Sequence, residues 1–107
     1  MDAKRLKALW RDLNAARRSP QTAGQLEALA KRCERHERAG GNHPVWVTDH
    51  FPHRPIPIGR HGGNRTLPAH ATKVILNALE ADAAAWEAHL ASTSDESNHD
   101  GQYNDGD

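Results

Sequence analysis

Two glycine pairs, Gly40-Gly41 and Gly62-Gly63, separate the centre of this chain from the segments on either side. Glycine pairs interrupt regular structure, so the chain is expected to change its secondary structure at both places. Between the pairs, apolar residues alternate with polar residues or prolines, which is the period of a β-strand. Outside the pairs, apolar residues recur every three or four positions, which is the period of a helix. The sequence therefore predicts an α+β fold.

Three segments carry a helical stripe of apolar residues. The first covers residues 3–18 and is broken by Ser19-Pro20, and the second begins near Gln21. The third is the strongest; it begins around Pro68, a favoured first-turn residue, and continues to about Ala91. The stripe positions are Leu6, Leu9, Trp10 and Leu13, then Leu26, Leu29, Ala30 and Cys33, then Ala71, Val74, Ile75, Ala78, Leu79, Ala83, Trp86 and Leu90.

Two short segments alternate as strands do. Residues 44–48 place two valines on one face and Trp46 on the other, where it is either core or exposed for contact. Residues 55–59 alternate isoleucine with proline, and because proline cannot donate a backbone hydrogen bond, this strand is expected at a sheet edge. The turn between them makes a β-hairpin. Two strands alone form a marginal sheet, which indicates that a third strand is missing from this pattern. Residues 34–38 have no β-branched or aromatic side chain, so their propensity indicates a helix or irregular structure.

Charge is distributed unevenly along the chain. All 14 lysines and arginines lie between Lys4 and Lys73, and residues 1–73 contain six acidic residues. Eight acidic residues and no lysine or arginine follow. A basic body favours an anionic partner, although a solvated surface explains the charge equally well. The single cysteine excludes an internal disulfide, and no apolar run is long enough for a signal peptide or a membrane span. We therefore expect a cytoplasmic protein without membrane contact.

Residues 92–107 are polar, acidic and almost free of apolar side chains, so they are expected to be disordered. The predicted organisation is an N-terminal helical extension over residues 1–20, one domain over residues 21–91 with an extended last helix, and this acidic tail.

Three pieces of the sequence, in this order, resemble a known family. They are Gly41-Asn42-His43 at the entrance of the first predicted strand, Ile58-Gly59-Arg60-His61 at the end of the second, and Leu67–Leu76 with its Ile75-Leu76 pair in the last helix. The set is similar to the HicA mRNA interferase toxins over roughly residues 24–79. Gly-x-His alone is a weak motif, and the ordered set is more specific.

The resemblance implies a reduced double-stranded-RNA-binding fold, in which a three-stranded antiparallel sheet packs on helices. It places the first strand of that sheet on residues 34–39. It also implies an endoribonuclease that cleaves mRNA with one histidine and no metal or other cofactor, and that is neutralised by a HicB-type antitoxin. Pro44, directly after the histidine, departs from the pattern of the family.

By the resemblance, His43 is the catalytic residue. Cleavage of RNA without a metal needs a group that moves protons near neutral pH, which histidine does. Gly41 and Asn42 beside it, Arg60 and His61 at the end of the second predicted strand, and Lys73 on the last helix are predicted RNA contacts. In an antiparallel hairpin, the start of one strand lies near the end of the next, so His43 and Arg60 are expected at one end of the sheet.

Other interpretations stay open. His50 and His53, with His43 and His61, give four imidazoles near one hairpin, but their spacing fits no zinc motif, and we predict no metal. His50 and His53 fall in the turn and receive no predicted role. The fold also suits a non-catalytic RNA-binding module, or a protein-interaction module that binds no nucleic acid, because fold alone does not determine function.

Overall fold

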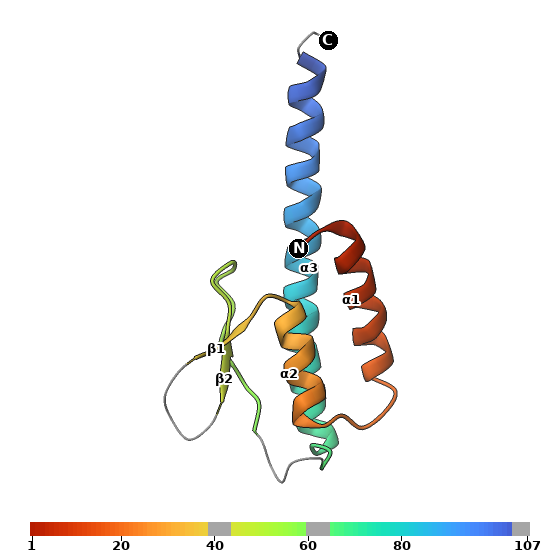
Figure 1. Cartoon of the computed structure of the whole chain (residues 1–107), viewed down its shortest axis with the longest axis vertical. Helices are drawn as coiled ribbons and strands as arrows, with labels where there is room; N and C mark the ends of the chain where they lie inside the picture. Colours follow the sequence, from red (N-terminus) through yellow and green to blue (C-terminus); the bar gives the residue numbers. More distant parts are fainter. Residues whose placement is uncertain (39–43, 60–64, 104–107) are drawn as a thin grey trace.

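The computed structural model describes residues 1–38, 44–59 and 65–103, with side chains described up to position 93. Within these ranges the elements follow in the order α1, α2, β1, β2, β3, α3 (Figure 1). Their bounds are Ala3–Ala16, Ala23–Arg32, His36–Arg38, Val45–Val47, Ile56–Pro57 and Ala69–Tyr103. The predicted α+β class, with a three-stranded antiparallel sheet and a helix at the N-terminus, is confirmed.

Short polar side chains start the first two helices. The carboxylate of Asp2 accepts the backbone N–H of Arg5 at 2.8 Å. Thr22 accepts the N–H of Gln25 at 3.2 Å, and the Gln25 side chain accepts the N–H of Thr22 at 2.8 Å. These bonds satisfy backbone donors that the first turn of a helix leaves without partners. The sequence therefore sets where α1 and α2 begin.

The end of α2 turns the chain toward the sheet. Glu34 has φ 68°, in the left-handed region where glycine is usual. Its N–H bonds the Lys31 carbonyl at 2.9 Å, and the N–H of Arg35 bonds the Ala30 carbonyl at 3.0 Å. This pair of bonds is a Schellman motif, which satisfies the last carbonyls of a helix and reverses the chain. It delivers Arg35 into the interior directly before β1 begins.

The sheet has β2 in the middle, paired antiparallel with both β1 and β3. Glu37 lies opposite Trp46, and Trp46 lies opposite Ile56. Pro57 is on an edge strand, as predicted. β1 falls within residues 34–39, where the family resemblance predicts a strand and the residue pattern indicates a helix or irregular structure. All three β1 residues are exposed, so pairing with β2 rather than local sequence preference explains this strand.

One apolar core joins the helices to one face of the sheet. In Figure 1 the sheet lies on one side of α2 and α3, and α1 lies on the other. α3 contacts α1, α2 and β3, so it is the element on which the others pack. Trp46 is 3% exposed and belongs to this core, which decides the question that its alternation leaves open. The stripes of α1 and α2 are buried as predicted, at Leu6, Leu9, Leu13, Leu26, Leu29, Ala30 and Cys33.

α3 differs from its prediction at two places. Val74, predicted on the apolar stripe, is 53% exposed, and the neighbouring Leu76 is buried instead. The stripe of this helix is broad, and contacts with α1 and α2 decide which side of it faces the core. The helix also continues to Tyr103, beyond Ala91, into the segment predicted to be disordered. No proline interrupts it there, and extending a formed helix costs less than starting one.

The last turns of α3 project beyond the other elements (Figure 1). Despite this length, none of the helices in the described ranges is apolar enough to cross a membrane.

Candidate functional site

Five of the six predicted site residues lie outside the described residues: Gly41, Asn42, His43, Arg60 and His61. The described strand ends next to them do meet. The N–H of Ile58 donates to the carbonyl of Pro44 at 3.1 Å, and Val45 lies opposite Pro57. The antiparallel hairpin predicted to join these segments at one end of the sheet is therefore present.

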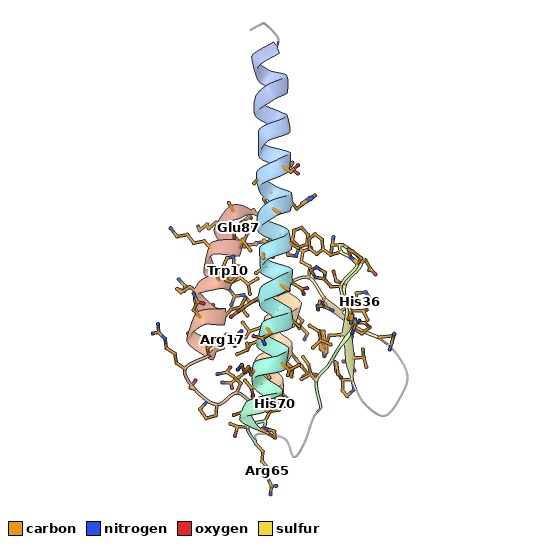
Figure 2. All side chains as sticks on the ribbon, turned by 180° about the vertical axis from the view of Figure 1, so that it is seen from behind. Trp10, Arg17, His36, Arg65, His70 and Glu87 are labelled. Carbon is orange, nitrogen blue, oxygen red and sulfur yellow. The ribbon has the colours of Figure 1, made fainter. Side chains whose placement is uncertain are left out.

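The sixth predicted residue, Lys73, lies on the first turns of α3. It lines a pocket of about 480 Å³ where the end of α1 and the start of α3 meet, together with Arg17, Arg18 and Thr72. Figure 2 shows Arg17 at this end of α1, with Arg65 and His70 near the start of α3. This end of the molecule is therefore rich in basic side chains.

The basic residues of this end differ in what they contact. Arg17 donates to both carboxylate oxygens of Glu80, at 2.7 and 2.8 Å. This hydrogen bond and the charge of Arg17 hold the pKa of Glu80 below its ordinary value, against partial burial. Arg18 and Lys73 form no ion pair with any residue of the described ranges. Their two positive charges are therefore free to meet an anion such as a phosphate.

Thr72 lines this pocket, and its hydroxyl is buried and unsatisfied. Its residue is 8% exposed, and its Oγ1 has no hydrogen-bond partner among the described residues. A buried polar atom without a partner is uncommon in folded proteins.

A second group of polar residues lies inside the molecule, and the sequence analysis missed it. The side chains of Arg35 and Asp82 are each 1% exposed and form a salt bridge with two hydrogen bonds, Nε to Oδ2 at 2.5 Å and Nη2 to Oδ1 at 2.9 Å. Arg35 also donates to the carbonyls of Trp46 at 2.9 Å and Arg54 at 3.1 Å. The pair thereby joins α3 to the middle strand of the sheet and to the loop that follows it.

His53 completes this group from that loop. Its Nδ1 lies 2.8 Å from Oδ1 of Asp82, and its side chain is 30% exposed. A carboxylate that takes both bonds of a guanidinium acts only as an acceptor, so Nδ1 of His53 carries the hydrogen. In the neutral form of the ring, Nε2 is then the nitrogen with the lone pair, and it makes no hydrogen bond within the described ranges.

A pocket of about 330 Å³ adjoins this histidine. It is lined by Arg35, His53 and Arg54 and by the apolar residues Pro52, Pro55, Ile56, Ala78 and Ala81. Such a volume is within the range of small-ligand sites. One sequence signal could have revealed this place: Asp82 falls on the apolar stripe of α3, between Leu79 and Trp86.

His36 of β1 and His50 of the loop after β2 also contact carboxylates. Nε2 of His36 lies 3.1 Å from Asp49, and Nε2 of His50 lies 3.5 Å from Glu34. The His50 ring also packs on Trp86, with 4.7 Å between centroids. These contacts fasten the loop after β2 to the body. Across the part of the chain that the structure describes, no three His, Cys, Asp or Glu side chains are grouped as metal ligands would be.

Cys33 is not a candidate nucleophile. The thiol is buried beneath α3, and its Sγ lies 3.8 Å from the Leu79 carbonyl. Burial raises the pKa of Cys33 to about 12, with a further contribution from the charge of Asp82. The reactive thiolate is therefore scarce at neutral pH.

Comparison of the chain with protein-family models, with curated proteins and with solved structures finds no match to any of them.

Proposed function

We propose that this protein is an endoribonuclease of the HicA type, which cleaves mRNA in the cytoplasm without a metal or cofactor. The proposed catalytic residue is His43, acting as general acid and base. The proposed fold is a reduced form of the double-stranded-RNA-binding domain, made of α2, the sheet and α3, with α1 as an addition. The proposed partners are RNA and a HicB-type antitoxin that neutralises the enzyme.

The observation that carries this proposal is β1. The resemblance to the HicA toxins predicts a strand on residues 34–39, where the residue pattern indicates a helix or irregular structure. A strand occupies His36–Arg38 and completes a three-stranded sheet, which follows α2 and precedes α3 in the chain. The position of this strand is predicted from the family alone, against local sequence preference, so it supports the resemblance more than an element that periodicity also predicts.

The chemistry of metal-free RNA cleavage suits the proposed residues. In such a reaction, a base takes the proton of the 2′-hydroxyl, an acid protonates the leaving 5′-oxygen, and positive groups stabilise the charge on phosphorus. A single histidine serves in proton transfer near neutral pH. Arg60 and His61 are proposed to bind the phosphate, and Gly41 and Asn42 to let the RNA backbone approach His43 closely.

The basic end of the molecule supports RNA as the partner. Lys73 and Arg18 line one pocket, and neither pairs with an acid of the described ranges. Unpaired lysines and arginines supply most of the affinity of a protein for nucleic-acid backbones. We propose that this pocket holds a phosphate of the RNA whose cleavage occurs at His43.

The test uses purified protein, an mRNA substrate and EDTA. The parent is expected to cleave the RNA despite chelation, and a His43→Ala variant is expected to lose the activity. A His89→Ala variant is the matched control, because His89 is an exposed histidine of α3 whose ring contacts only Trp86 among the described aromatic rings. Growth arrest on expression, relieved in His43→Ala, would add support from the cell.

The result also separates the two alternatives. Salt-dependent RNA binding without cleavage by the parent would favour a non-catalytic RNA-binding module. Absence of salt-dependent RNA binding would favour a protein-interaction module.

A further inference from the structure

We propose that His53, oriented by Asp82, is a second acid–base residue for RNA, acting in the pocket between the β2–β3 loop and α3. The inference rests on the proposed function for its substrate class, RNA, but not for its site. Its evidence comes entirely from described residues.

The His53 ring is oriented by a buried carboxylate. Nδ1 of His53 donates to a carboxylate that is 1% exposed and is itself fixed by two bonds from Arg35. Catalytic histidines depend on such a partner, since it selects the tautomer and stabilises the imidazolium that forms when the ring takes a proton.

The other ring nitrogen of His53, Nε2, is on the accessible side of the ring. The His53 side chain is 30% exposed and lines the 330 Å³ pocket, so a substrate can reach the ring from outside. Nε2, which holds the lone pair when the ring is neutral, has no hydrogen-bond partner in the described ranges. A general base needs a ring that is held in place and a free nitrogen that the substrate can reach. Asp82 holds the His53 ring, and Nε2 is the nitrogen within reach.

The wall of the pocket combines a cationic side chain with apolar residues. Arg54 lines the pocket beside His53, and no acid of the described ranges forms an ion pair with its guanidinium. Arg35 also lines the pocket, but its charge is paired with Asp82. The other lining residues are apolar: Pro52, Pro55, Ile56, Ala78 and Ala81. A cation beside an apolar wall suits a nucleotide, whose phosphate is anionic and whose base presents an apolar face.

RNA supplies its own nucleophile, so this small set of groups is sufficient. Nε2 of His53 takes the proton of the 2′-hydroxyl, a bond forms between the 2′-oxygen and phosphorus, and the bond from phosphorus to the 5′-oxygen breaks. The 5′-oxygen takes a proton from water, and the imidazolium returns its proton to solvent. The products are a 2′,3′-cyclic phosphate and a 5′-hydroxyl, and no oxidant, reductant or metal takes part. Arg54 stabilises the negative charge on the phosphate oxygens.

The decisive variant is His53→Asn. The amide nitrogen of asparagine can donate to Asp82 in place of Nδ1, which preserves the structural bond, but asparagine cannot accept a proton at neutral pH. His50→Gln is the matched control, because His50 belongs to the same loop and also contacts a carboxylate, on Glu34. Thermal unfolding of each variant establishes that the fold is intact.

Cleavage of a single-stranded RNA oligonucleotide is followed in EDTA for the parent, His53→Asn, His50→Gln and His43→Ala. We expect His53→Asn to unfold at the temperature of the parent and to lose on the order of 100-fold in kcat/KM, the usual contribution of a positioned acid–base group. His50→Gln should retain the activity of the parent.

The outcomes also separate this inference from the proposed function. Full activity of His53→Asn beside an inactive His43→Ala would overturn the role of His53 and leave the proposed function standing. An inactive His53→Asn beside an active His43→Ala would keep the inference and remove His43 from the mechanism. A parent that cleaves no RNA would overturn both.

Discussion

Arg35 and Asp82 lie 47 residues apart in the chain and form a fully buried, two-bond ion pair in the interior of the protein. Arg35 follows the left-handed turn that ends α2, and Asp82 comes from the middle of α3. Through Arg35 the pair also holds the carbonyls of Trp46 and Arg54, and through Asp82 it holds His53. One contact thus connects the stability of the fold with the geometry of a candidate site.

Replacing one member of this pair is expected to destabilise the protein strongly. Asp82→Asn leaves the Arg35 guanidinium buried without a counter-charge, a change that costs about 3–5 kcal/mol in comparable pairs. The free energy of unfolding in urea measures the loss. Arg35→Met with Asp82→Leu should recover most of it, because removing both charges avoids the unpaired one. Equal stability of Asp82→Asn and the parent would contradict this account.

The Arg17–Glu80 pair predicts a dependence of stability on pH. The pKa of Glu80 is lowered in the folded protein, chiefly by the hydrogen bond from Arg17. A lowered folded-state pKa gives stability that is present above the unfolded value and lost as pH falls through the folded one. The difference in unfolding free energy between the parent and Glu80→Gln should therefore be constant near neutral pH and shrink below about pH 4.3. A difference that grows in acid would show the opposite sign.

The expected size of this difference is modest. The side chains of Arg17 and Glu80 are 31% and 25% exposed, so solvent weakens their attraction. We expect about 1 kcal/mol at neutral pH, which is well below the cost of Asp82→Asn. Urea unfolding of both variants under the same conditions compares the surface pair with the buried one.

The left-handed residue at the end of α2 offers a separate test. Glycine adopts the φ of 68° at Glu34 without steric cost, so Glu34→Gly should relieve about 1 kcal/mol of backbone strain. The same change removes contacts of the carboxylate with the N-terminal amine at 2.6 Å and with His50 at 3.5 Å. Glu34→Gln is the matched control, since it removes the charge and keeps the backbone. Glu34→Gly should be the more stable of the two variants in thermal unfolding.

RNA affinity is expected to depend on the basic pocket at the start of α3. Lys73→Ala and Arg18→Ala should each weaken binding uniformly across RNA sequences and reduce the slope of log K against log salt by about 1. Lys4→Ala is the control, because Lys4 is exposed on the first turn of α1, at the other end of that helix from Arg18. The slope is measured by titration of a fluorescent RNA at several salt concentrations. Equal effects of all three changes would show that only overall charge matters.

Much of the helical structure could be predicted because its signal is local. In α1 and α2, the residues that must share a face stand three or four positions apart, so periodicity alone identified the buried stripes. The hairpin strands were visible for the same reason, since their period is two. Val74 lies on the predicted stripe but is exposed, so periodicity alone does not determine burial. Periodicity identifies an apolar side of α3, but contacts with α1 and α2 determine which residues at its margin are buried.

The candidate site could be predicted only in part. Lys73 came from the family resemblance, and the other five predicted residues lie outside the described ranges. The sequence places His53 in a turn and indicates no role for it, because nothing near it in the chain reveals a partner 29 residues away on α3. Asp82 on an apolar stripe was the visible sign that such a partner had to exist, because a buried carboxylate needs compensation.

By itself the sequence determined the helical faces, the two alternating strands and the division into a basic body and an acidic end. Each of these is encoded by neighbouring residues, through side-chain period and local charge. Only the tertiary structure decided that exposed residues 36–38 form a strand, that Trp46 faces the core, and that Arg35, Asp82 and His53 meet. These depend on which distant segments pack together, and the free energy of a buried ion pair exists only once the rest of the core has excluded water from it.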